Sequence, residues 1–88
     1  MIIKFSKKAQ KDLDKVPEHV QRKMLDWLDS ITEKGLAGTR KVKGWHDEPL
    51  KGERKGQRSV RLNISYRAIY VEETGEILEV IEVNRHKY

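Results

Sequence analysis

The sequence of 88 residues contains no cysteine, which excludes disulfide bonds and thiolate metal sites. It also lacks a glycine-rich phosphate-binding loop and an HExxH zinc motif, and its three histidines are not spaced like metal ligands. Its apolar runs are too short for a signal peptide or a membrane span. We therefore expect one soluble domain, residues 1–88, located in the cytoplasm and working without a cofactor, a metal ion or a membrane.

Positive charge is concentrated in the middle of the sequence. Residues 40–67 carry nine basic and three acidic side chains, whereas residues 68–88 carry two basic and five acidic ones. The chain as a whole has a formal net charge of +5. A basic segment on a small domain is typical of proteins that bind a polyanion, although ordinary solvated surfaces also carry such segments. The net charge also suits an acidic protein partner.

The first part of the chain has helical periodicity after a short apolar start. Residues 2–5 predict an edge strand, and Ser6 is a suitable N-cap for the helix that follows. Apolar residues at helical spacing then predict two helices joined at Val16–Pro17, and Gly35 is expected to end the second one. We interpret the apolar stripe of the second helix as a core face, with docking of a partner helix as the alternative.

The second part changes from a loop to an alternating pattern. Residues 35–57 are rich in glycine and charge and predict a long loop, with a short strand around Lys41–Val42. Three strands are then predicted, at 60–64, 66–71 and 77–83. The last of these is apolar on both faces, as is typical of a central strand. The order β-α-α-β-β-β predicts an α+β fold, with a two-helix hairpin packed on one face of a small antiparallel or mixed sheet.

Four residues are candidates for catalysis. Glu48 is an acid in a basic loop, and the proline after it favours an extended backbone that projects its side chain. Arg67 is a charged residue inside an apolar strand, so it must reach a surface or find a partner. His86 and Tyr88 lie two residues apart after the last strand, and in an extended chain they point to the same side.

These residue types fit the cleavage of RNA without a metal ion. A carboxylate such as Glu48 accepts the proton of the 2′-hydroxyl that attacks the adjacent phosphate. A guanidinium such as Arg67 binds phosphate oxygens bidentately and offsets the charge of the transition state. His86 would then donate a proton to the leaving 5′-oxygen, and Tyr88 would contact a base or the phosphate.

Structural roles for the same residues stay open at this point. Glu48 could pair with Lys51 or Arg54, and Arg67 could pair across the sheet with Glu79 or Glu82. His86 and Tyr88 could be frayed terminal residues.

The combination of motifs resembles the RelE/ParE toxin superfamily, and its pattern is closest to the YoeB and HigB branches. The matching segments are Glu48-Pro49-Leu50-Lys51-Gly52, Arg61-Leu62, Tyr66-Arg67-Ala68-Ile69-Tyr70 and Val83-Asn84-Arg85-His86-Lys87-Tyr88. The order of helices and strands matches as well, so the resemblance spans the chain. It implies a microbial-ribonuclease-like fold, ribosome-dependent cleavage of mRNA in the A site, and neutralisation by a cognate antitoxin.

The resemblance also implies roles for individual residues. Glu48 matches the general base of the YoeB-like branch, Arg67 the phosphate-binding arginine and Tyr88 the C-terminal tyrosine. HigB-like relatives have a histidine before the proline, so His46 competes with Glu48 for the role of base. In YoeB-like relatives the histidine and tyrosine are adjacent, so Lys87 competes with His86 for the role of acid.

A set of basic residues is expected to bind the RNA substrate around this site. They are Lys51, Arg54, Lys55, Arg58, Arg61 and Lys87. We predict the toxin of a type II toxin–antitoxin system, an endoribonuclease whose partners are the ribosome (30S A site), mRNA and an acidic antitoxin. Two alternatives stay open. One is a ParE-like inhibitor of DNA gyrase without RNase activity, and the other is a non-catalytic RNA-binding module.

Overall fold

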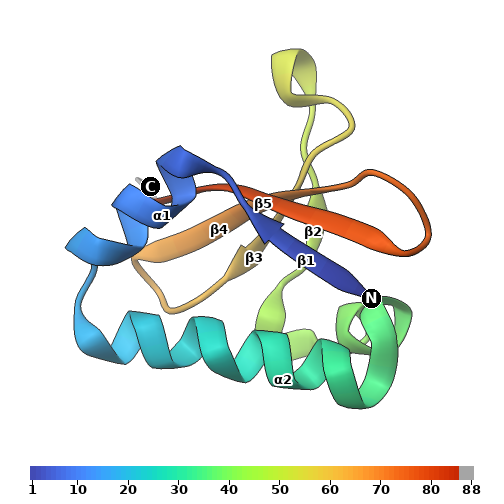
Figure 1. Cartoon of the computed structure of the whole chain (residues 1–88), viewed down its shortest axis with the longest axis horizontal. Coiled ribbons are helices and arrows are strands. Elements are labelled where there is room, and N and C mark those ends of the chain that lie inside the picture. The colour runs from blue at the N-terminus through green and yellow to red at the C-terminus, as the bar shows by residue number, and fades with distance from the viewer. Residues whose placement is uncertain (86–88) are drawn as a thin grey trace.

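The computed structural model describes residues 1–85 as two helices packed against a five-stranded sheet (Figure 1). The elements are β1 (Ile2–Phe5), α1 (Lys7–Lys15), α2 (Glu18–Arg40), the 3₁₀ turn η1 (Lys43–Trp45), β2 (Glu48–Pro49), the 3₁₀ turn η2 (Gly52–Arg54), β3 (Arg58–Arg61), β4 (Tyr66–Glu72) and β5 (Ile77–Arg85). The strand order is β1-β5-β4-β3-β2. Strand β1 pairs with β5 in parallel, and the other pairs are antiparallel. The predicted α+β fold is confirmed.

The start of α1 is fastened to the central strand β5. The Ser6 hydroxyl accepts a hydrogen bond from the backbone N–H of Ala9 (3.0 Å), which confirms the predicted N-cap, and donates one to the Ile81 carbonyl (2.7 Å). Further along α1, the Asp12 carboxylate accepts a hydrogen bond from the backbone N–H of Val83 (3.0 Å). The ladder between β4 and β5 changes register here, so these two side chains bond to backbone groups beside an irregular stretch of β5.

Helix α2 continues beyond the residue that was expected to end it. Gly35 has φ 73° and ψ 171°, so it interrupts the helix, which then resumes as far as Arg40. The resumed turn carries Leu36 and Thr39, which are buried, and Thr39 shares a hydrogen bond of 2.9 Å with Ser30. Gly35 therefore ends the regular helix, as predicted, but a further helical turn follows it because the residues of that turn are buried against the core.

The prediction of a strand around Lys41–Val42 was wrong. Lys41 forms the C-cap of α2 and is followed by η1, in which Trp45 is buried. The short strand in this region is β2, which pairs with β3 at Glu48 and Pro49. The loop therefore reaches the edge of the sheet later than expected, because Trp45 first anchors it to the core.

The core lies between the helices and one face of the sheet. Its largest members include Trp27 of α2 and Tyr70 of β4, whose ring centroids are 5.2 Å apart. Strand β5 lies between β1 and β4, as expected for a strand that is apolar on both faces. Figure 1 shows α2 running along one side of the sheet, while the loop that contains η2 projects away at the other end of the molecule. Ala9 of α1 and Trp27 of α2 belong to the same core, so both helices pack on one face of the sheet.

Candidate functional site

Two rows of mostly polar side chains cross the sheet on the face away from the helices. Residues that pair directly across antiparallel strands point to the same face. In the first row, Arg61 of β3 pairs with Arg67 of β4, which pairs with Asn84 of β5. The neighbouring row contains Glu48, Ser59, Ile69 and Glu82. Strand pairing thus brings Glu48 of the loop and Arg67 of the sheet to one surface.

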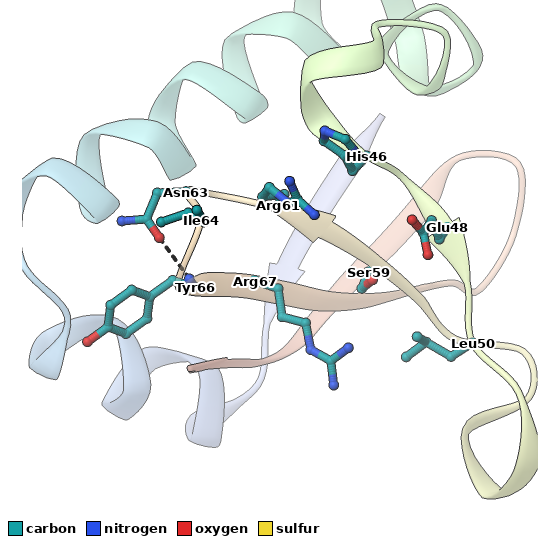
Figure 2. A pocket seen from close by; sticks show the side chains of 9 residues that line it. All are labelled: His46, Glu48, Leu50, Ser59, Arg61, Asn63, Ile64, Tyr66 and Arg67. Atoms are coloured by element: carbon teal, nitrogen blue, oxygen red, sulfur yellow. Dashed lines mark hydrogen bonds between the residues drawn. The ribbon is translucent and has the colours of Figure 1, made fainter. Parts of the chain in front are cut away.

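A shallow pocket opens on this surface (Figure 2). It is lined by His46, Glu48, Leu50, Ser59, Arg61, Asn63, Ile64, Tyr66 and Arg67. Both candidates for the general base and the candidate phosphate-binding arginine therefore line the same pocket. Glu48 and His46 are exposed, and the two arginines are partly buried. A carboxylate, an imidazole and two guanidinium groups together can bind a phosphate and accept a proton next to it.

The backbone segment that carries His46 and Glu48 is anchored to the rest of the fold. Trp45 is buried in the core, and His46 follows it with a left-handed backbone (φ 45°), which is uncommon for a residue other than glycine. Glu48 belongs to β2 and pairs with Ser59, so its backbone is extended as the following proline predicted. The backbone thus presents both side chains at the pocket from a short, anchored segment.

Asp47 is the buried anchor of this segment. Its side chain has no exposed surface, and its two oxygens accept hydrogen bonds from Arg58 Nε (2.6 Å) and the Tyr70 hydroxyl (2.5 Å). Arg40 of α2 donates to the Tyr70 hydroxyl (3.1 Å) and forms an ion pair with Glu72 (3.2 Å). This network joins the end of α2 to strands β3 and β4. The network holds Asp47, which lies between His46 and Glu48 in the sequence, on the helix side of the sheet.

The same network changes the acidity of Tyr70. Burial, together with the hydrogen bond to Asp47, raises the pKa of Tyr70 to about 12, although Arg40 acts in the opposite direction. Ionisation of the phenol would place a second negative charge against the Asp47 carboxylate. The hydroxyl therefore stays a hydrogen-bond donor in the folded protein.

Arg67 is held by a chain of hydrogen bonds on the open face. Its Nε donates to Asn84 Oδ1 (3.2 Å), and Asn84 Nδ2 donates to Glu82 Oε2 (2.7 Å). The other oxygen of Glu82 forms an ion pair with Arg54 from η2. Partial burial would raise the pKa of Glu82, but the bonds from Asn84 and Arg54 outweigh it and lower that pKa below its usual value. Glu82 is therefore a carboxylate at neutral pH.

The structure separates the predicted substrate-binding residues into two groups. Arg61 lines the pocket, and Lys51 and Lys55 are exposed on the loop around η2. Arg54 and Arg58 instead form intramolecular ion pairs, with Glu82 and Asp47 respectively. Arg58 also lies on the helix side of the sheet, because it pairs directly with the core residue Tyr70.

Three predicted site residues, His86, Lys87 and Tyr88, lie outside the described residues. Within residues 1–85, neither Lys51 nor Arg54 forms an ion pair with Glu48. Arg67 bonds to neither Glu79 nor Glu82 directly but reaches Glu82 through Asn84. In the same part of the chain, no group of three or more His, Asp or Glu side chains is arranged to hold a metal ion.

Two residues of the site were missed by the sequence analysis. Asp47 is one of two neighbouring acids, and nothing in the sequence distinguishes the buried one from the exposed one. Asn84 bonds to Arg67 and was overlooked because it lies among the last residues of a mostly apolar strand. The signal that would have found it is the strand register, which places it directly opposite Arg67.

Solved structures with the same fold are toxins, some of them in toxin–antitoxin complexes. The chain is similar to the YoeB/ParE toxin from Agrobacterium tumefaciens, with 24% identity over 99% of this chain and 100% of that one, and a TM-score of 0.76. It is similar to the YoeB–YefM complex from Staphylococcus aureus (22% identity, 99% and 98% covered, TM-score 0.75). It is also similar to the toxin chain of the DinJ–YafQ complex from E. coli (19% identity, 96% and 91% covered, TM-score 0.74). These likenesses show that the chain has the fold of the YoeB and YafQ toxins.

The family model for the ParE toxin of the type II toxin–antitoxin system parDE matches residues 3–87. The chain therefore belongs to the ParE toxin family, within the RelE/ParE superfamily that its sequence motifs indicated, and it is a toxin of the type II toxin–antitoxin class. No curated protein sequence matches it significantly. No helix within residues 1–85 is long and apolar enough to cross a membrane.

Proposed function

We propose that this toxin is a ribosome-dependent endoribonuclease that cleaves mRNA in the A site without a metal cofactor. The observation that carries the proposal is the joint placement of Glu48, Arg61 and Arg67 in one open pocket. Two arginines directly opposite each other on neighbouring strands, without a carboxylate bonded to either in residues 1–85, suit a phosphate of the RNA backbone.

The proposed reaction is an attack by the 2′-hydroxyl on the adjacent phosphorus. Glu48 accepts the hydroxyl proton as the O2′–P bond forms, and the P–O5′ bond breaks. Arg67, assisted by Arg61, binds the non-bridging oxygens and offsets the charge that develops on them. His86 donates a proton to the leaving O5′, and Tyr88 contacts the phosphate or a base. The products are a 2′,3′-cyclic phosphate and a 5′-hydroxyl.

The basic loop supplies the rest of the RNA contact in this proposal. Lys51 and Lys55 are exposed on the loop around η2 and are free of ion pairs with residues 1–85. They would bind phosphates of mRNA or of the 30S A site in the cytoplasm. Relatives of the same fold occur as complexes with YefM and DinJ. We propose that a cognate acidic antitoxin likewise binds this toxin, whose formal net charge is +5.

Inhibition of DNA gyrase is the second candidate function, because the matching family model is that of the ParE toxin. It is disfavoured by the pocket, since a gyrase inhibitor needs neither a proton acceptor nor a phosphate-binding pair of arginines. Primer extension on purified ribosomes programmed with a defined mRNA tests the first candidate. We expect a cut within the A-site codon for the wild type and none for Arg67→Ala. Intact mRNA together with inhibited DNA supercoiling by gyrase would favour the second candidate.

A further inference from the structure

Within residues 1–85, the partly buried Arg67 has a neutral hydrogen-bond partner. Its Nε–H bonds to the amide oxygen of Asn84 and not to a carboxylate. An amide oxygen fixes the plane of the guanidinium but does not neutralise its charge. Because Nε is occupied, the two terminal nitrogens, which bond to no residue in 1–85, are left for another acceptor. That arrangement suits an arginine whose charge must stay available to an anion and whose guanidinium must stay oriented.

The orientation of Asn84 is itself determined by Glu82. Asn84 Nδ2 donates to Glu82 Oε2 (2.7 Å), and the Glu82 carboxylate can only accept, so Asn84 must turn its oxygen toward Arg67. The second oxygen of Glu82 is bonded to Arg54 of η2. Four side chains therefore form one directed chain from the basic loop to the pocket: Arg54, Glu82, Asn84 and Arg67.

We propose that Glu82 and Asn84 are positioning residues that orient the Arg67 guanidinium for an RNA phosphate and couple it to the loop that carries Arg54. The proposal rests on the proposed function of Arg67 as a phosphate-binding residue. We call this chain of hydrogen bonds from Arg54 through Glu82 and Asn84 to Arg67 the relay. The relay keeps the Arg67 side chain preorganised, so little side-chain entropy is lost when a phosphate binds. The lowered pKa of Glu82 keeps its carboxylate available as an acceptor throughout the neutral range.

A double-mutant cycle tests whether Asn84 acts through Arg67. Asn84→Ala is expected to lower kcat/KM on programmed ribosomes about tenfold, within the range found for residues in one hydrogen-bond network. In the Arg67→Lys background, which lacks the guanidinium but keeps measurable activity, the same change is expected to have almost no further effect. Glu79→Gln is the matched control, because Glu79 lies on the same strand and its side chain has no hydrogen bond or ion pair within residues 1–85. Additive effects of Asn84→Ala and Arg67→Lys would overturn the relay.

Exchanging the carboxylate at position 82 with the amide at position 84 tests whether lost activity can be recovered. Asn84→Asp alone puts two carboxylates where a 2.7 Å hydrogen bond was, and we expect it to reduce activity. The double variant Glu82→Gln/Asn84→Asp restores a donor at position 82 and an acceptor at position 84, and it preserves the net charge. Activity should recover only in part, since both hydrogen bonds are re-formed but the new carboxylate offsets the charge of Arg67. Failure of the double variant to recover any activity lost by Asn84→Asp would contradict the relay.

The resonance of the Arg67 Nε–H group separates failure of the relay from failure of the proposed function. In the purified toxin it is expected to be protected from solvent exchange, to lose that protection in Asn84→Ala, and to be unchanged in Glu79→Gln. If the wild type cleaves no ribosome-bound mRNA, the proposed function is wrong, and the relay is decided by this resonance alone. If Asn84→Ala and Glu82→Gln leave the Arg67 resonance unchanged, the relay is wrong whatever the activity.

Discussion

Arg61 and Arg67 lie directly opposite each other on the neighbouring strands β3 and β4, on the face of the sheet that the helices leave uncovered. Like charges in this position repel each other and destabilise a sheet, so the pair does not contribute to the stability of the fold. Neither guanidinium bonds to a carboxylate in the described part of the chain, although Arg40, Arg54 and Arg58 all do. The contrast supports an anion-binding role for the pair.

The first prediction concerns the geometry of phosphate binding. Arg67→Lys keeps the charge but loses the two parallel hydrogen bonds of a guanidinium, so we expect kcat/KM to fall at least about tenfold. Arg67→Ala should also lower the salt dependence of binding to non-cleavable RNA, by roughly 0.7 in the slope of log K against log salt. Lys34→Ala on α2 is the control and should leave both values unchanged. A mild effect of Arg67→Lys would instead favour the non-catalytic RNA-binding module.

The second prediction concerns the general base. Glu48→Gln removes the proton acceptor and keeps the shape, so single-turnover cleavage should slow by roughly 10²- to 10⁴-fold with little change in RNA binding. Glu53→Gln, an exposed acid in the same loop, is the matched control. His46→Ala decides between the two candidates for the base. A loss of cleavage in His46→Ala together with a fully active Glu48→Gln would assign the base to His46.

The third prediction concerns Asp47 as a structural anchor. Asp47→Ala removes the acceptor of the buried Tyr70 hydroxyl and the partner of the partly buried Arg58, so it should lower the free energy of unfolding by about 1–3 kcal/mol. Asp26→Ala, an exposed acid on α2, should change it by less than about 0.5 kcal/mol. Urea denaturation followed by circular dichroism measures both values. Equal stability of the two variants would show that Asp47 does not anchor the loop.

The fourth prediction concerns pH. The pKa of Tyr70 is raised to about 12 in the folded protein, from 10.0 for an ordinary tyrosine. The unfolded chain therefore loses this proton first, and the stability that the neutral phenol contributes is complete below pH 10 and falls as the pH rises towards 12. Thermal unfolding between pH 9 and 12 should show this loss in the wild type, and Tyr70→Phe should show a smaller dependence on pH. An identical dependence in both proteins would contradict the assignment.

The fifth prediction concerns the interruption of α2. Gly35 has φ 73° and ψ 171°, a conformation that is essentially limited to glycine, and a Cβ there would meet no atom within 4 Å. Gly35→Ala should therefore destabilise the protein through backbone strain alone, by about 1–3 kcal/mol. Gly44→Ala is the matched control, because its Cβ also meets nothing and its φ is not in the positive range. Differential scanning calorimetry should give a clearly lower Tm only for Gly35→Ala.

Much of the fold follows from hydrophobic periodicity in the sequence. The change from helical to alternating spacing near Val60 places the helices before the sheet, and apolar residues on both faces of the last strand indicate its central position. The details after Gly35 could not be predicted, because they depend on which loop residues reach the core. Trp45 does so, and it displaces the short strand from Lys41–Val42 to Glu48–Pro49.

The site was only partly predictable for a related reason. Arg67 is conspicuous as a charge within an apolar strand. Asp47 and Glu48 are neighbouring acids, and only the path of the loop directs Asp47 into the protein and Glu48 to the pocket. Alternation along β3 does separate Arg58 from Arg61, since residues three apart in a strand face opposite sides. The roles of Arg54 and Asn84 depend on the register between distant segments, which a single sequence does not contain.

Mapping of mRNA 5′ ends after induced expression tests the central claim most directly. The wild-type toxin should produce new ends inside translated codons of many mRNAs, and these ends should disappear when translation initiation is blocked. The variants Glu48→Gln and Arg67→Ala, confirmed as folded by circular dichroism, should produce none and should not arrest growth. Growth arrest by the wild type with intact mRNA, or arrest by both variants, would contradict the proposal that this pocket cleaves mRNA on the ribosome.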